Sequence, residues 1–142
     1  MALADHDQIN GITGAIIKGA LEVHRGLGPG LLESAYLECL VFELRTAGRA
    51  VEVQKTLPLV YKGVSLDCGY RIDLVVDERV IVEVKCVSQF APIHHAQLLT
   101  YLKLTGCPAG LLLNFHVPVL KQGIRRVLNT RPPASPPDEE PP

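Results

Sequence analysis

The stretch from Tyr70 to Lys85 constrains the fold of this chain more than any other. It reads YRIDLVVDERVIVEVK, and its valine and isoleucine residues predict two strands, 70–76 and 79–86, joined by a short polar turn. Strands with so many aliphatic residues are typical of the centre of a sheet that is covered on both faces. We therefore expect the rest of the domain to be built around this hairpin.

Three charged side chains interrupt the apolar strands: Asp73, Glu83 and Lys85. A buried charge is costly unless it is paired or binds a metal. A two-residue turn would place Asp73 opposite Val82, whereas a three-residue loop or a bulge places Asp73 opposite Glu83, with Cβ atoms about 5 Å apart. Two carboxylates at that separation repel each other unless a cation lies between them. We therefore predict the second register and a divalent metal.

The composition indicates one globular domain with a substantial core, because 47% of the 142 residues are hydrophobic. The formal net charge is −1, so any nucleic-acid binding must rely on a local patch or on metal. The four cysteines form no CxxC pair, and those in predicted strands, Cys68 and Cys86, are expected to be buried thiols. Without a signal peptide or a long apolar run, the sequence predicts a cytoplasmic protein that does not associate with membranes.

The order of predicted elements indicates an α/β fold with a mixed sheet. We expect a frayed N-terminus at 1–8, one folded domain at 9–128, and a disordered, proline-rich acidic tail at 129–142. The apolar pattern within the domain predicts, in chain order, helices at 9–25 and 31–47, strands at 50–55, 57–61 and 64–76, the second hairpin strand, a helix at 93–104, a strand at 109–115 and an edge strand within 120–128.

A fourth acidic residue, Glu33, lies in the first turn of the second predicted helix, on the same face as Tyr36. From the pattern alone, Glu33 is explained by the favourable helix dipole at that end. Together with Asp73, Glu83 and Lys85 it also fits magnesium chemistry on a phosphodiester, because magnesium takes hard oxygen ligands and keeps several waters. On an exposed hairpin the same charges would form a solvated salt-bridge ladder, which the aliphatic flanks disfavour.

Several motifs resemble one known family. Residues 30–36, GLLESAY, match the G-x-x-E-x-x-Y signature of the GxxExxY family, which is grouped with the PD-(D/E)XK nuclease superfamily. Residues 70–73 resemble its Y-R-x-D strand, residues 83–85 its E-x-K motif, and residues 94–102 its H-x-x-Q-L-x-x-Y-L helix. The resemblance extends over about residues 9–128, which is nearly the whole predicted domain.

The resemblance implies a restriction-endonuclease-like α-β-β-β-α-β core with a mixed central sheet flanked by helices. It implies Glu33, Asp73 and Glu83 as ligands of Mg²⁺, with Mn²⁺ as a substitute. The backbone carbonyl of Val84 would be a further ligand, and Lys85 the catalytic lysine. The expected function is a nuclease, acting on DNA rather than RNA, that hydrolyses phosphodiester bonds by metal-activated water without a covalent intermediate.

The predicted helix at 93–104 supplies residues expected to bind substrate or to support the site. Gln97 and Tyr101 resemble the Q-x-x-x-Y motif of RecB-like nucleases, where it supports the site and contacts DNA. From the residues alone, Tyr36 and Tyr101 are better explained as packing residues whose hydroxyl groups are tethered. His94 has two interpretations: it contacts phosphate, or it caps its own helix.

Two rival functions also fit the sequence. The chain could be a catalytically silent nuclease-fold module that binds nucleic acid or a partner protein, an interpretation favoured by the absence of a basic surplus. It could also be a structural subunit whose acidic cluster binds a stabilising cation. If the protein binds duplex nucleic acid, a homodimer is expected, because a domain this small offers little surface for contact with a duplex.

Overall fold

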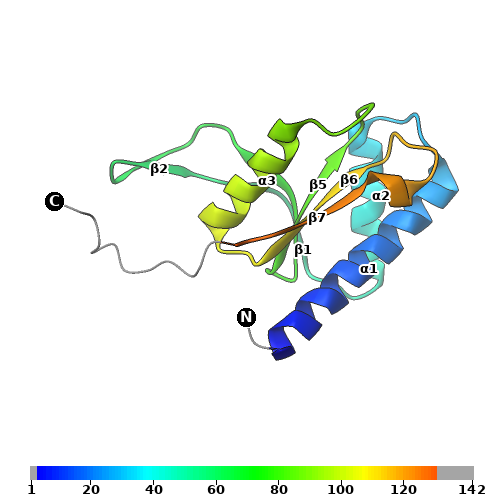
Figure 1. Cartoon of the computed structure of the whole chain (residues 1–142), viewed down its shortest axis with the longest axis horizontal. Coiled ribbons are helices and arrows are strands. Elements are labelled where there is room, and N and C mark those ends of the chain that lie inside the picture. The colour runs from blue at the N-terminus through cyan, green and yellow to red at the C-terminus, as the bar shows by residue number, and fades with distance from the viewer. Residues whose placement is uncertain (1–2, 131–142) are drawn as a thin grey trace.

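The computed structural model of the chain describes residues 3–130. Figure 1 shows a central sheet with helices on both sides and one hairpin that extends away from the body. The elements in chain order are α1 (Leu3–Leu27), α2 (Glu33–Thr46), β1 (Val51–Thr56), β2 (Leu59–Tyr61), β3 (Val64–Leu66), β4 (Arg71–Val76), β5 (Val80–Lys85), α3 (Pro92–Thr105), β6 (Ala109–Asn114), the 3-10 helix η1 (Leu120–Gly123) and β7 (Ile124–Leu128).

The central sheet has five strands in the order β1-β4-β5-β6-β7. All neighbouring pairs are antiparallel except β5 and β6, which are parallel and are connected through α3. A parallel connection needs a crossover element, and α3 supplies it. The predicted α/β class with a mixed sheet is therefore confirmed, and the edge strand predicted near the end of the domain is β7.

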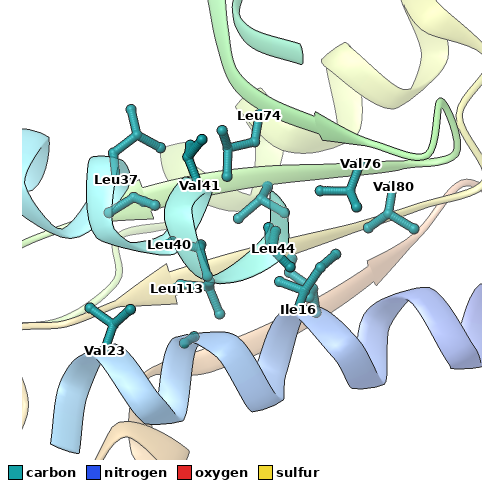
Figure 2. Packing of buried hydrophobic residues seen from close by; sticks show 14 of the residues in the cluster. Ile16, Val23, Leu37, Leu40, Val41, Leu44, Leu74, Val76, Val80 and Leu113 are labelled. Carbon is teal, nitrogen blue, oxygen red and sulfur yellow. The ribbon is translucent and has the colours of Figure 1, made fainter. Parts of the chain in front are cut away.

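Aliphatic side chains form a core on each face of this sheet. On one face, α1 and α2 pack against β4, β5 and β6, as Figure 2 shows for Ile16, Leu40 and Leu44 around Val76 and Val80. On the other face, α3 packs against the same strands. Each fully buried aliphatic side chain contributes about 1.5–3 kcal/mol, so the two-sided burial explains the Val- and Ile-rich hairpin. The second core includes Ile72, Val75, Ile81, Leu98, Leu102 and Leu112.

The β4–β5 hairpin has the register predicted from its charges. A three-residue turn at 77–79 joins the strands, and the last paired residues before the acids are Leu74 and Val82. One further step along this register places Asp73 opposite Glu83. The sequence-based expectation of a three-residue loop, rather than a two-residue turn, is confirmed.

The sequence predicts a strand at 64–76 with a bulge or bend at Gly69; the structure does turn at Gly69, but it divides the segment into two strands, β3 and β4, so the expectation of one continuous strand is wrong. β3 pairs with β2 in a separate two-stranded sheet, which we call the β2–β3 arm (residues 59–66). Between β3 and β4 the Asp67 carboxylate accepts a hydrogen bond from the Gly69 N–H at 3.0 Å, which turns the chain. Most residues of the arm are exposed, and it extends away from the body (Figure 1).

The N-terminal segment is more ordered than the sequence suggests. Helix α1 begins at Leu3, so residues 3–8, expected to be frayed, are helical. Gln8 accepts a hydrogen bond from the Arg79 guanidinium at 2.8 Å, which connects the first turns of α1 to the β4–β5 turn. The tail expected at 129–142 lies outside the described residues from residue 131 onward.

The four cysteines are all free thiols. Cys68, expected to be buried in a strand, is exposed in the loop between β3 and β4, and Cys86 is half-buried directly after β5. The expected burial is wrong for Cys68 and only partly met by Cys86, which packs against the core, because the strands end earlier than the aliphatic pattern suggested. Within residues 3–130, no helix has an apolar stretch of the length that a bilayer span requires.

We predict that Gly123→Ala destabilises the domain. A Cβ atom at Gly123 would lie 2.2 Å from the backbone oxygen of Asn114, and a backbone atom of the sheet cannot move aside as a flexible side chain can. Urea denaturation should show a loss of about 1–3 kcal/mol in the free energy of unfolding. Gly14→Ala is the control, because that exposed position in α1 has nothing within 4 Å of the added atom and should gain about 0.5–1 kcal/mol. Similar effects of both changes would contradict this packing.

Candidate active site

The acidic pair lies where the pairing of β4 with β5 ends. Beyond Leu74 and Val82, carboxylates take the place of backbone carbonyls as hydrogen-bond acceptors. Glu83 Oε2 accepts the N–H of Asp73 at 2.9 Å, and Asp73 Oδ2 accepts the N–H of Val84 at 2.8 Å. Each carboxylate therefore binds the backbone of the opposite strand, and the two acidic groups face each other across the end of the hairpin.

Burial makes negative charge unfavourable at this pair. Glu83 is only 5% exposed, and burial together with the charge of Asp73 raises its pKa to about 7. Burial also raises the pKa of Asp73, although the hydrogen bond from Val84 and the charge of Lys85 oppose this rise. Lys85 Nζ lies 4.0 Å from Glu83 Oε1. A single ammonium group does not balance two carboxylates, so the site favours a further positive charge.

Glu33 is the first residue of α2, and its side chain reaches the end of β5. Leu32, the preceding cap residue, makes no side-chain cap hydrogen bond. Glu33 Oε2 instead accepts the N–H of Cys86 at 3.2 Å. Burial is the main cause of the raised pKa values of Asp73 and Glu83, and the negative charge of Glu33 adds to both. The helix dipole alone therefore does not account for Glu33, because its carboxylate interacts with the acidic pair.

Tyr36 fixes the loop from which α2 starts. Its side chain is fully buried and stacks on Phe115, with ring centroids 4.5 Å apart. The hydroxyl group donates to the carbonyl of Gly28 and accepts the N–H of Leu31 at 3.1 Å. This is the packing role with a tethered hydroxyl that the sequence favoured, and it sets the position of Glu33 at the start of the helix.

Two polar residues that the sequence did not assign also shape the site. Asn114 is 2% exposed at the end of β6, where its Nδ2 donates to the carbonyl of Val87 at 2.8 Å and its Oδ1 accepts the N–H of the same residue at 3.1 Å. This pair of bonds fixes the chain just after Lys85. An asparagine in an otherwise apolar strand was the available signal, because buried polar groups need partners.

The second of these residues is Gln54 in β1. The pairing of Val53 with Leu74 and of Lys55 with Ile72 leaves Gln54 beside Asp73. Its backbone has a left-handed φ of 52°, which is uncommon for a residue other than glycine. Its side chain forms a hydrogen bond with the Asp73 carboxylate that opposes the rise in the pKa of Asp73. No sequence pattern indicated this contact, because it depends on a local break in strand geometry.

Helix α3 places Tyr101 near the acids and Gln97 beside Tyr101. Tyr101 is 5% exposed, and burial followed by the charge of Glu83 raises its pKa, while a hydrogen bond from Gln97 opposes the rise. His94 has a different orientation: its Nδ1 accepts the N–H of Ala91 at 3.0 Å. Of the two interpretations of His94, capping of its own helix is therefore the one observed.

The oxygen donors of the site suit magnesium. Within residues 3–130 no group of three or more His, Cys, Asp or Glu side chains is preassembled as a metal site, so Glu33 interacts with the pair without completing a three-carboxylate cluster. Magnesium does not require one, because it is usually held by one or two carboxylates and keeps several waters. Asp73 and Glu83, facing each other with raised pKa values, fit this requirement.

We compared the sequence with models of known protein families. Residues 10–127 match the sequence profile of the PD-(D/E)XK nuclease superfamily. The chain belongs to that superfamily. The comparisons with curated proteins and with solved structures found no match. Membership of the PD-(D/E)XK superfamily supports a nuclease-type function, and nucleases of this superfamily generally use divalent metals. The narrower GxxExxY assignment stays a prediction.

We predict that Glu83→Gln stabilises the metal-free protein at about pH 8. The folded pKa of Glu83, about 7, is above its ordinary value of 4.5, so the folded state loses stability as pH rises through this interval. Glutamine keeps an oxygen for the Asp73 N–H but carries no charge. The free energy of unfolding should exceed that of the wild type by about 1–3 kcal/mol at high pH and match it near pH 4.

Exposed Glu38 provides the control for this measurement. Glu38→Gln should change the free energy of unfolding by a similar, small amount at both pH values, because its carboxylate is solvated in either state. A difference between Glu83→Gln and the wild type that does not depend on pH would contradict the charge argument.

Proposed function

We propose that the protein is a magnesium-dependent nuclease that hydrolyses phosphodiester bonds of DNA by metal-activated water. The observation that carries this proposal is the facing pair of Asp73 and Glu83, buried at the end of β4 and β5, with the Lys85 ammonium 4.0 Å from Glu83. This arrangement combines oxygen ligands, a deficit of positive charge and the compact positive charge of a lysine in one place. Membership of a nuclease superfamily agrees with it.

The metal would be held by Asp73 and Glu83, with the carbonyl of Val84 and the carboxylate of Glu33 as further ligands. A bound divalent cation would polarise a phosphoryl oxygen and make a coordinated water more acidic. Burial is the larger cause of the raised pKa of Glu83, and repulsion by Asp73 is the second. The cation would remove this repulsion. Manganese, with similar preference for oxygen ligands, is the expected substitute.

Lys85 would act on the reacting phosphate. Its side chain is 19% exposed, so the ammonium group is shielded but still accessible to a substrate. A lysine ammonium is a compact point charge with three donors. It would orient the attacking water and offset the negative charge that develops on the phosphoryl oxygens in the transition state, a type of stabilisation that is stronger in a site with little water.

Residues from three other elements would support the reacting groups. Glu33 is exposed at the start of α2 and would contribute a carboxylate to the acidic site from the solvent side. Tyr101 on α3 lies near the acidic pair and is hydrogen-bonded to Gln97, and Gln54 on β1 forms a hydrogen bond with Asp73. We expect the protein to act in the cytoplasm, and a homodimer stays a prediction from its size.

A catalytically silent nucleic-acid-binding module is the second candidate. Two observations favour it: the net charge of −1, and the hydrogen bonds that Asp73 and Glu83 accept from backbone amides of the opposite strand. In this alternative the acids are clamps between β4 and β5 that stabilise the fold. The two candidates differ in whether Lys85 is needed for turnover.

We predict that Asp73→Asn and Lys85→Ala each reduce metal-dependent cleavage of DNA by about 100-fold or more. Asparagine keeps an acceptor for the Val84 N–H, so the first variant should remain folded, which circular dichroism would check. The matched controls are Asp7→Asn and Lys18→Ala, both exposed on α1. DNA binding without cleavage in the wild type would support the silent module, and equal losses in the controls would exclude a specific site.

We also predict that Mg²⁺ raises the melting temperature of the wild type at about pH 8, and that Asp73→Asn removes this effect. A ligand at 100 times its dissociation constant stabilises a folded protein by about 2.7 kcal/mol. The stabilisation should weaken below pH 7, because protonation of Glu83 competes with the cation. Stabilisation by Mg²⁺ without any cleavage would point to a structural cation site.

A further inference from the structure

A cavity of about 290 Å³ lies between α3 and the base of the β2–β3 arm. Its walls are mostly apolar, with Leu57 from the chain before the arm and Ala96 from α3 among them. Tyr70 and Tyr101 add two aromatic rings. None of the described residues that line this cavity is charged. A cavity of this size holds one ring system rather than a peptide segment.

The two tyrosine rings give this cavity aromatic surface. Tyr70 meets Tyr101 edge to face, with ring centroids 6.5 Å apart and an interplanar angle of 70°. Tyr70 is 45% exposed, so part of its ring remains open to a ligand. Stacking of a nucleobase on an aromatic side chain contributes about 1–3 kcal/mol per base, and every base has a suitable face.

The polar groups of the cavity are neutral. Gln97 and Thr100 lie along it and offer an amide and a hydroxyl group, each able to donate and accept hydrogen bonds. A phosphate or carboxylate would find no cation here, whereas a neutral heteroaromatic ring would find apolar walls and hydrogen-bonding partners. The chemistry of the lining therefore matches a nucleobase better than an anion.

The cavity adjoins the acidic pair. Tyr101 lines the cavity, and besides burial the charges of Glu83 and Asp73 influence its hydroxyl group. Tyr70, which also lines the cavity, directly precedes β4, which carries Asp73 three residues further on. A nucleotide next to a phosphodiester at the acids would therefore have its base at the entrance of the cavity.

We propose that this cavity, here called the base pocket (Tyr70, Ala96, Gln97, Thr100 and Tyr101), binds one unpaired nucleobase of the substrate. The inference rests on the proposed function, and it names the substrate class as single-stranded nucleic acid or unpaired ends. A base inside a duplex is stacked and paired, so it would have to leave the helix at a cost of a few kcal/mol before it could enter.

Fluorescence anisotropy with labelled thymidine 12-mers tests the base pocket without relying on turnover. The full chain, with Ca²⁺ in place of Mg²⁺, should bind the single strand at least tenfold more tightly than the matching duplex. A single strand with one abasic nucleotide in its centre should bind several-fold more weakly. Ala96→Trp fills the pocket from an exposed helix position and should remove both preferences.

Three tyrosine variants complete the test. Tyr70→Ala should weaken single-strand binding about tenfold, and Tyr70→Phe, which keeps the ring, should restore most of it. Tyr61→Ala is the control, because Tyr61 is 60% exposed on the arm outside the pocket and should have no effect. Equal affinity for single strand and duplex, or an abasic effect that persists in Ala96→Trp, would overturn the inference.

The outcomes also separate this inference from the proposed function. Cleavage of DNA that requires Lys85 but shows no preference for unpaired bases would leave the nuclease proposal intact and overturn the base pocket. Pocket-dependent binding without cleavage would support the base pocket and favour the silent module. Absence of binding to any nucleic acid would overturn both.

Discussion

The structure depends on the placement of two like charges in the apolar centre of a sheet. Asp73 and Glu83 face each other where β4 and β5 stop pairing, and each carboxylate binds a backbone N–H of the opposite strand. These bonds take the place of the backbone hydrogen bonds that β4 and β5 no longer form there, so the two backbone N–H groups keep an acceptor. What they leave unsatisfied is the charge, as the pKa of Glu83 shows. Two neighbouring charges act on this negative charge: Lys85 on β5 offsets it, and Glu33 on α2 adds to it.

The main features of this centre could be predicted from the sequence because they follow from local rules. Aliphatic runs identify buried strands, and the charges of Asp73 and Glu83 select the register that brings them together. The boundaries of α2 and α3 and the edge strand β7 follow from periodicity and from glycine and proline signals, whereas the start of α1 at Leu3 does not. The sequence also favoured a packing role for Tyr36, and the structure shows its ring stacked on that of Phe115.

Other features could not be predicted, because they depend on contacts between distant segments or on backbone irregularities. Gln54 forms a hydrogen bond with Asp73 from a position in β1 where the backbone has a left-handed φ of 52°. The division of the predicted strand at 64–76 separates the β2–β3 arm from the central sheet, and aliphatic content alone does not reveal which strands pair. The base pocket depends on this division, because one of its walls comes from the chain between the arm and β4.

The hydrogen bonds of the acidic pair have a consequence for how such a domain can change over generations. A lineage that lost hydrolysis would still gain from Asp73 and Glu83, since both hold strands together. The side chain of Lys85 makes no such backbone hydrogen bond within the described residues, and its structural contribution is the ion pair with Glu83. If Lys85 were lost, protonation of Glu83, whose pKa is about 7, would remove the unpaired charge. Drift in an inactive descendant should therefore appear first at the lysine, while the carboxylates persist as part of the architecture.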